Sequence, residues 1–289
     1  MAANWYTHRD VLKESLTIPA CTTANHTFLD QVLETVARNI DRHLGFHLYP
    51  SSGIRYFRPR QTTYLDLDYP LLNIDAIALD TNADSSYEST LDSTSYYMVP
   101  YNATEESPRQ PWWAIEIRTR TNASAIFPIR VAQGVRITGT WGYYNERDET
   151  TCRPATAMDA TQLTMKMTGA TNLHPGQTIR VDSEQIFVVA NGLSGSDTAT
   201  TSGIIAVKRA QNGTPGATHS SLSTASIYTY PVVSAAALYQ AGMDYRAKDA
   251  PLGITGTDPT WNQTVRAPGG FHPFVRRLLD EAFRTPRVG

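Results

Sequence analysis

The segment ANHTFLDQVLETVARNIDRHL, residues 24–44, carries the clearest folding signal of the chain. Its apolar residues recur at intervals of three and four positions, which places them on one stripe of an α-helix. The pair Thr22-Thr23 precedes it in a capping position, and Gly45 follows it where a left-handed C-cap residue is expected. We therefore predict an amphipathic helix over residues 24–44, with a shorter helix at residues 8–16 that ends before Pro19.

Downstream of this helix, apolar residues alternate with polar ones instead of following a helical period. Between residues 54 and 143 such runs are separated by Pro, Asn, Asp and Ser, which is typical of an antiparallel sheet or small sandwich. Four similar runs between residues 150 and 230 predict a small inserted β-barrel or sandwich. The predicted strands cover residues 54–56, 64–68, 96–99, 113–117, 135–138, 162–165, 178–181, 185–189 and 204–207.

Helical periodicity returns near the end of the sequence. Pro231 is suited to the first turn of a helix that extends to about Lys248, and a second helix begins near Pro273. The intervening residues 249–270 are rich in Pro, Gly and Thr. We predict that they form a long loop, of the kind that commonly reaches a partner.

The order of these elements predicts an α+β fold. In it, the N- and C-terminal helices form a helical core, joined to an antiparallel β-sheet region and to an inserted small β-barrel or sandwich domain. We expect residues 1–149 to hold the N-terminal helices and the sheet, and residues 150–230 to form the inserted domain. Residues 231–289 would complete the core with the C-terminal helices and a docking tail.

The composition limits the classes of protein to which the chain can belong. Of its 289 residues, 41% are hydrophobic and 18% are charged, so a folded chain with a real core is expected. A formal net charge of −2 argues against a basic surface that coats nucleic acid or anionic lipid. The sequence has neither a bilayer-spanning apolar stretch nor an export signal in its first 15 residues, which predicts synthesis in a cytoplasm and no membrane association.

The sequence contains none of the familiar motifs for nucleophilic, metal-dependent or nucleotide chemistry. Cys21 and Cys152 lie far apart, which favours two free thiols over a zinc site or a disulfide. His43 and His47 are four residues apart with Gly45 between them, so we interpret them as helix-end histidines. We predict that the chain is not an enzyme and that it holds no cofactor and no metal ion.

Two groups of side chains leave alternative functions open. Asp66 and Asp68 alternate with leucines on a predicted strand, so both carboxylates point away from the sheet core. Paired carboxylates can serve as the general acid and base of a hydrolase. Trp112 and Trp113 lie in a region of aromatic strands that could stack against a sugar, which makes a β-rich glycan-binding module the main alternative.

The C-terminal helix carries the strongest signal for a protein partner. From residue 266 onward the chain has five arginines and two acidic residues. Arginine is favoured where planar hydrogen bonding across an interface matters. A helix with one apolar and one arginine-rich face, placed after a long loop, is typical of an element that docks into another chain. An ordinary packing helix with a solvated face is the alternative that these features leave open. The residues predicted to bind this partner are Phe274, Arg276, Arg277, Leu278, Phe283, Arg284 and Arg287.

Two motifs mark the boundaries of the inserted segment. GTWGY, residues 139–143, ends a predicted strand, and PVVSAAA, residues 231–237, opens a predicted helix. In the head-to-tail connector (adaptor) proteins of tailed bacteriophages, such a strand end is followed closely by such a helix, and the chain resembles this family. Here residues 150–230 separate the two motifs, and this segment resembles a small β module of phage structural proteins. The resemblance also includes FLDQVLETVARNID at 28–41, RYF at 55–57, LDLD at 65–68 and YMVPYN at 97–102.

The resemblance implies a structural role in the virion. Connectors of this family form a closed, usually dodecameric ring beneath the portal, at the neck between head and tail. Their partners are the portal protein above and a stopper or tail-completion protein below, and DNA passes through the channel without sequence-specific binding. The resemblance further implies that the C-terminal segment reaches the portal, that the protein is made in the host cytoplasm and that it is not an enzyme.

Overall fold

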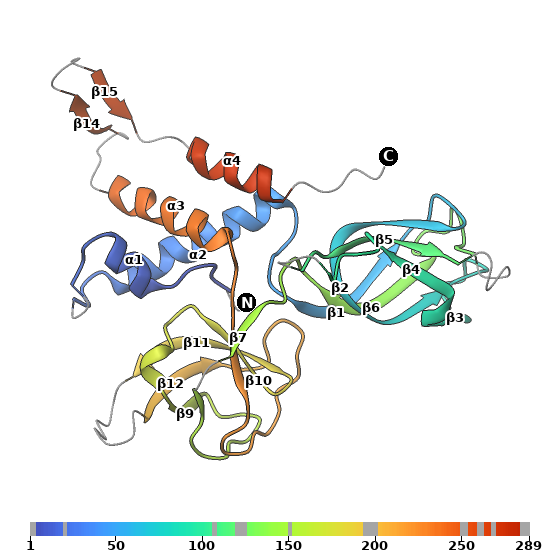
Figure 1. Ribbon diagram of the computed structural model, residues 1–289, viewed down its shortest axis with the longest axis horizontal. Helices are drawn as coiled ribbons and strands as arrows, with labels where there is room; N and C mark the ends of the chain where they lie inside the picture. The colour runs from blue at the N-terminus through green and yellow to red at the C-terminus, as the bar shows by residue number, and fades with distance from the viewer. Residues whose placement is uncertain are drawn as a thin grey trace. The chain divides into compact units, whose positions relative to one another are not determined.

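A computed structural model describes residues 4–19, 22–105, 109–118, 126–149, 152–192, 202–248, 254–258, 263–266 and 270–283. The chain divides into two compact units (Figure 1). We call Met1–Gly45, Arg147–Gln211 and Pro215–Arg284 the helix-and-sheet unit. The six-stranded unit comprises Phe46–Glu146 and the short segment Asn212–Thr214.

The six-stranded unit is built on one antiparallel sheet. Its strand order is β1-β6-β2-β5-β4, and β3 pairs with β2. Strand β2 is long enough to pair first with β5 and then, beyond Pro70, with β6. Bulges where the partner changes let the strand bend from one partner to the other. The strands are β1 (Ser51–Phe57), β2 (Tyr64–Leu79), β3 (Ser89–Leu91), β4 (Tyr96–Val99), β5 (Trp112–Ile117) and β6 (Val135–Trp141).

The GTWGY motif at the end of β6 serves the packing of this sheet. A Cβ atom at Gly139 would lie 2.2 Å from the carbonyl oxygen of Asn73 on β2, so only glycine permits the close approach of the two strands. Trp141 is 1% exposed, and its indole nitrogen donates to the carbonyl of Gly53 on β1. Gly142 has a φ of 146°, where side chains are strained. The residues of the motif are therefore required for the packing of the sheet.

The second sheet belongs to the helix-and-sheet unit. It is antiparallel, with seven strands in the order β7-β13-β10-β11-β12-β9-β8. Its inward side chains, such as Met165, Ile179 and Ile205, are fully buried. The thiol of Cys152 is buried there and donates to the carbonyl of Gly169, whereas Cys21 lies outside the described residues. The strands are β7 (Arg147–Glu149), β8 (Arg153–Pro154), β9 (Thr164–Thr168), β10 (Thr178–Val181), β11 (Glu184–Gly192), β12 (Ser202–Lys208) and β13 (Ala225–Tyr228).

Four helices accompany this sheet among the described residues. Helix α2 contacts α1 and α3, and α3 contacts α4. The predicted stripe of α2 faces these neighbours, with Leu29, Leu33 and Ile40 almost fully buried. The helices are α1 (Arg9–Ser15), α2 (His26–Leu44), α3 (Val233–Ala247) and α4 (Pro273–Ala282).

The residues before α1 join the helices to the seven-stranded sheet. Trp5 packs edge-on against Phe187 of β11, and a Cβ atom at Gly176 would lie 2.0 Å from the Trp5 ring. Gly176 has a φ of 98°, so both its conformation and the space occupied by Trp5 require glycine. The side chain of Asn4 accepts a hydrogen bond from Thr178 of β10. Residues 4 and 5 are thereby fixed on the sheet, and α1 follows directly.

The predicted helical adaptor core of N- and C-terminal helices is wrong. The described residues are mostly β structure, in antiparallel sheets of six and seven strands, with four short helices beside them. Each sheet closes a hydrophobic core of its own. The β segments are therefore not excursions from a helical framework, because more of the buried apolar side chains lie in strands than in helices.

Many individual elements nevertheless match their predicted positions. Helix α2 fills the predicted segment, and Gly45 adopts the left-handed C-cap with a φ of 80°. The predicted long loop at residues 249–270 is wrong in part, because β14 (Ile254–Asp258) and β15 (Gln263–Arg266) pair as an antiparallel hairpin. The division into domains 1–149, 150–230 and 231–289 stays a prediction.

A buried ionic cluster fastens the loop after β12 to the seven-stranded sheet. Glu184 is fully buried and receives two hydrogen bonds from the guanidinium of Arg209, at 2.7 and 2.5 Å. The backbone amides of Ala210 and Ala217 donate to the same carboxylate, and Nε2 of His219 lies 2.9 Å from it. Burial alone would raise the pKa of Glu184, but these hydrogen bonds outweigh it and lower the pKa to about 2.

We predict that this cluster makes folding stability depend on acid pH. A carboxyl group with a pKa of 4.5 when unfolded and about 2 when folded contributes stability that is complete above pH 4.5 and is lost as the pH falls toward 2. The difference corresponds to roughly 3 kcal/mol. Glu184→Gln should be less stable at pH 7 by about 3–5 kcal/mol, because it leaves Arg209 buried without its counter-charge.

Urea unfolding followed by circular dichroism between pH 3 and 7 measures this. The difference between wild type and Glu184→Gln should shrink below pH 4.5, whereas Glu281→Gln, on an exposed part of α4, should follow the wild type throughout. A constant difference between wild type and Glu184→Gln across this range would contradict the prediction.

Candidate docking surface

Helix α4 is attached to the helix-and-sheet unit by its apolar stripe. Val275 and Leu279 are fully buried, and Phe283, directly after the helix, is 5% exposed. Asp280 on a neighbouring face accepts from the imidazole of His43 on α2 at 2.8 Å. The helix predicted to dock into a partner is therefore already packed within its own unit, and only its outer face is available.

The start of α4 is fixed by a buried glutamine of α3. The amide oxygen of Gln240 accepts from the backbone amide of His272, and its nitrogen donates to Asp244 at 2.8 Å. Nδ1 of His272 in turn accepts from the backbone amide of Phe274, which caps the helix. The first turn of α4 thus has a defined position relative to α3.

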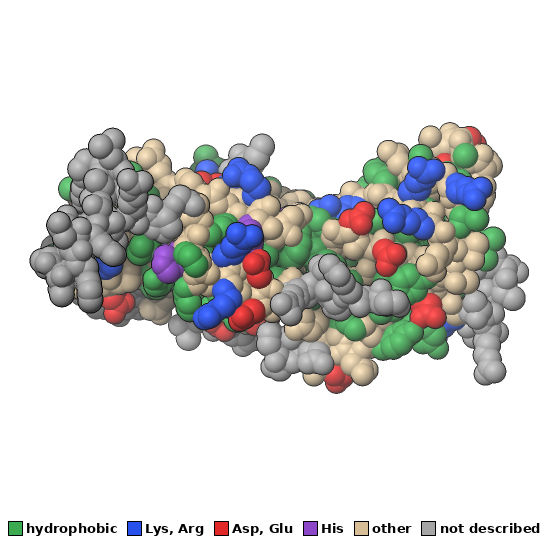
Figure 2. All heavy atoms as spheres, turned by 90° about the horizontal axis from the view of Figure 1, so that it is seen from above, with side chains coloured by type: hydrophobic (Ala, Val, Ile, Leu, Met, Phe, Trp, Pro, Cys, Tyr) green, Lys and Arg blue, Asp and Glu red, His purple; other side chains and the backbone are tan. Residues whose placement is uncertain are grey.

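Two aromatic side chains project beside this first turn. Tyr239 of α3 is 41% exposed and Phe274 of α4 is 43% exposed, with their ring centroids 5.3 Å apart. Arg276 and Arg277 flank them with strongly exposed side chains. Figure 2 shows basic, acidic and hydrophobic side chains interspersed over the helices on this side. We call Tyr239, His272, Phe274, Arg276 and Arg277 the α3–α4 surface.

The arginines of this surface are held only weakly by their own helix. Arg276 lies 3.8 Å from Asp280 and Arg277 lies 4.0 Å from Glu281, both as exposed pairs four residues apart. Such pairs contribute at most about 0.5 kcal/mol. The guanidinium groups can therefore turn toward an acidic partner at little cost in stability.

The seven residues predicted to bind a partner occupy different environments. Phe274, Arg276 and Arg277 are exposed. Leu278 is half-buried, and Phe283 belongs to the packed stripe. Arg284 and Arg287 lie outside the described residues. What these side chains contact in a complex stays a prediction.

The six-stranded unit has an aromatic pocket of about 760 Å³. Tyr96, Tyr97 and Trp112 line it, together with Tyr101, which is 64% exposed. The guanidinium of Arg118 lies 3.9 Å from the centre of the Tyr97 ring, a cation–π distance. Of the two tryptophans predicted as a sugar platform, the structure brings only Trp112 to this pocket.

The other tryptophan and the paired carboxylates lie elsewhere in the same unit. Trp113 is 9% exposed and packs edge-on against Phe46. Asp66 and Asp68 point away from the core, as predicted, into a groove that also contains Arg58 and Arg130. The two carboxylates thus share an open groove with basic side chains, and the described residues form no enclosed pocket around them.

The predicted helix-end histidines have side-chain partners. His43 is bound to Asp280, as described above. His47 stacks on Tyr49 and forms a hydrogen bond with the hydroxyl of Tyr69. Neither belongs to a group of three ligating side chains in the described residues.

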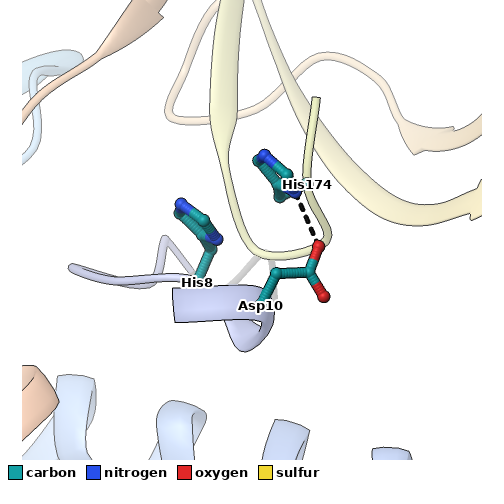
Figure 3. A group of neighbouring side chains, drawn as sticks. All are labelled: His8, Asp10 and His174. Carbon is teal, nitrogen blue, oxygen red and sulfur yellow. Dashed lines mark hydrogen bonds and ion pairs between the residues drawn. The ribbon is translucent and has the colours of Figure 1, made fainter. Parts of the chain in front are cut away.

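A third feature was not anticipated from the sequence. His8, Asp10 and His174 lie together where α1 meets the turn before β10 (Figure 3). Burial and, to a smaller extent, the neighbouring His174 lower the pKa of His8 to about 4, against the opposing effect of Asp10. His8 and Asp10 are two residues apart, but His174 is remote in sequence, so only the tertiary fold reveals the group.

Comparison with family models, with curated proteins and with solved structures found no match to this chain. The resemblance to phage connectors stays an expectation from the sequence. Among the described helices, none has the combined length and apolar character needed to cross a membrane.

We predict that the two faces of α4 differ sharply in their contribution to stability. Leu279→Ala should lower the free energy of unfolding by about 2–5 kcal/mol, because it leaves a cavity against α3. Phe274→Ala should lower it by much less, about 1 kcal/mol or below, because 43% of this residue is exposed and its removal leaves no enclosed cavity. Urea unfolding of the two variants measures the difference, and similar losses in both would show that Phe274 is part of the core.

Proposed function

We propose that the chain is a structural subunit of the neck of a tailed bacteriophage, a head-to-tail connector. Copies of the chain form a ring beneath the portal, around the channel through which DNA passes. The ring joins the portal above to a stopper or tail-completion protein below. The protein acts by assembly, with no chemical step.

The observation that carries this proposal is the series of connector-like sequence segments, above all GTWGY and PVVSAAA. In the structure, GTWGY has demanding roles: Gly139 permits close strand contact, Trp141 fills the core and Gly142 takes a positive φ. Because three of the five residues have specific roles in packing the sheet, a match to the connector motif suggests a sheet built in the same way. The PVVSAAA segment leads into α3, which contacts α2 and whose Ala236, Ala237 and Ala241 are buried.

The α3–α4 surface supports contact with the portal. Interface hot spots are enriched in aromatic residues and arginine, held on a rigid support. Tyr239 and Phe274 provide exposed rings beside Arg276 and Arg277, while buried Gln240 fixes the helix that carries them. This surface can therefore bind a partner without reorganising its own unit.

A ring also requires contacts between copies of the chain. Ring closure is heterologous, so each copy needs two different complementary surfaces. On β1, Ile54 and Tyr56 are two residues apart and so project from the same face of the strand, and each is about half exposed. These apolar side chains on an edge strand give the six-stranded unit one surface suited to a neighbouring copy.

We predict that portal rings bind the chain through the α3–α4 surface. In native mass spectrometry, portal rings from the same source should gain about one chain per portal subunit, even if the free chain is monomeric. Phe274→Ala combined with Arg277→Glu should weaken this binding at least tenfold, because it removes an exposed ring and reverses a charge.

The matched control is Leu222→Ala combined with Arg153→Glu, which changes one exposed apolar residue and one exposed arginine on the seven-stranded sheet side. It should bind as the wild type does. No mass gain with the wild type would refute the connector proposal. Equal binding by both double variants would place portal docking on another surface.

A second candidate function is carbohydrate binding by the six-stranded unit. It is favoured by the pocket of Tyr96, Tyr97, Tyr101 and Trp112, in which Asn73 and Arg118 supply polar groups. Aromatic faces stack on sugar rings, and a few polar side chains set orientation. The pocket lies in the six-stranded unit.

If this second function holds, a glycan array should detect sugars that bind the full chain, and Trp112→Ala should remove the binding. Tyr56→Ala is the control, because Tyr56 is a half-exposed aromatic residue outside this pocket. Failure of the wild type to bind any glycan on the array would eliminate the candidate.

A further inference from the structure

Three potential metal ligands from two separate parts of the sequence meet in the helix-and-sheet unit. His8 precedes α1, Asp10 lies in its first turn, and His174 lies in the turn before β10. Each offers a ligand atom within 4.8 Å of the other two. The imidazole rings are stacked with centroids 4.3 Å apart, and the Asp10 carboxylate reaches Nδ1 of His174 at 2.6 Å (Figure 3).

The partners of these groups account for only part of the arrangement. The ion pair of Asp10 and His174 satisfies one ring nitrogen of His174. Nδ1 of His8, however, is buried and has no hydrogen-bond partner. A buried ring nitrogen without a partner is costly, and stacking two imidazoles does not remove that cost. A metal ion bound by the three side chains would satisfy it once the stacked rings turn, because each imidazole binds a metal through a lone pair in its ring plane.

Both sides of the group are held in place by neighbouring contacts. The backbone amide of His174 donates to the side chain of Gln177 at 2.8 Å, and the amide of Gln177 donates back to the carbonyl of His174. Helix α1 is anchored by fully buried Leu12 and by the ion pair of Arg9 with Asp30 at 2.9 Å. The ligands thus come from preorganised segments, which lowers the entropy cost of binding an ion.

The chemistry of the donors selects a class of ion. Two imidazoles and one carboxylate suit divalent transition metals, zinc in particular, and leave further coordination positions for water. Asp10 is about half exposed and His174 about a quarter, so an ion can enter from solvent. The Asp10 carboxylate neutralises one of the two positive charges of a divalent ion. Bound water can hydrate the remaining charge.

We propose that His8, Asp10 and His174 form a binding site for a divalent transition metal ion, which cross-links α1 to the turn that precedes β10. The site would strengthen the same junction that Trp5 and Gly176 form. It is independent of the proposed connector function, since it concerns the stability of one unit.

The test uses the full chain without a histidine tag, freed of metal by a chelator and titrated with Zn²⁺ in a calorimeter. The wild type should bind one ion per chain, and its melting temperature should rise by about 4 °C or more at saturating zinc. His8→Gln, Asp10→Asn and His174→Gln should each weaken binding at least tenfold. His272→Gln, which changes a histidine of the α3–α4 surface, should bind zinc as the wild type does.

A further variant separates this site from an acidic one. Asp80, Asp84 and Glu88 are the other three ligating side chains that meet in the described residues, and Asp84→Asn should leave zinc binding unchanged. Long-range ¹H–¹⁵N spectra of the wild type give a measurement that depends on no variant: zinc should shift the imidazole nitrogens of two histidines. The proposal is overturned if the wild type binds no zinc or if the three ligand variants bind zinc as well as the wild type does. It is overturned equally if Asp84→Asn loses zinc binding or if zinc leaves the histidine signals unshifted.

Discussion

The contact between Trp5 and the glycine turn before β10 is the constraint on which the helix-and-sheet unit depends. The indole ring occupies the space that any side chain at position 176 would need, and Gly176 is in turn the residue that its positive φ requires. Asn4 and Tyr6, on either side of Trp5, bond to β10 and to α2 respectively. One small residue in a turn therefore makes room for the contact that joins the helices to the sheet.

The sequence predicts local structure here far better than it predicts architecture. The stripe of α2 and its cap at Gly45 follow from spacing alone, because a helix is decided by residues within one or two turns. The fold class does not follow from spacing, because it depends on which elements pack together into hydrophobic cores, and here two sheets do so. The β14–β15 hairpin is hidden in a Thr- and Gly-rich stretch that lacks apolar alternation. The His8, Asp10 and His174 group depends on a contact across more than 160 residues, which no local pattern encodes.

The residues of the connector-like motifs and the residues suited to contact a partner are different sets. Gly139, Trp141 and Gly142 are packed within the six-stranded unit, so they are not available to contact a partner. Phe274, Arg276 and Arg277 lie on a helix whose other face is needed for stability. Of the predicted docking residues, sequence reasoning could identify the helix and its arginines. It could not divide exposed Phe274 from buried Phe283, because that depends on which side of the helix α3 covers.

The division of the helix-and-sheet unit along the sequence affects how the chain can fold during synthesis. Helices α1 and α2 leave the ribosome early, but α3 begins about 190 residues after α2 ends (44 to 233). At roughly 5–20 residues per second, the apolar stripe of α2 waits on the order of 10–40 s for its partner. The six-stranded unit is nearly continuous in sequence and can close in the meantime. In a nascent chain the apolar stripe of α2 is therefore exposed to solvent until α3 has been synthesised.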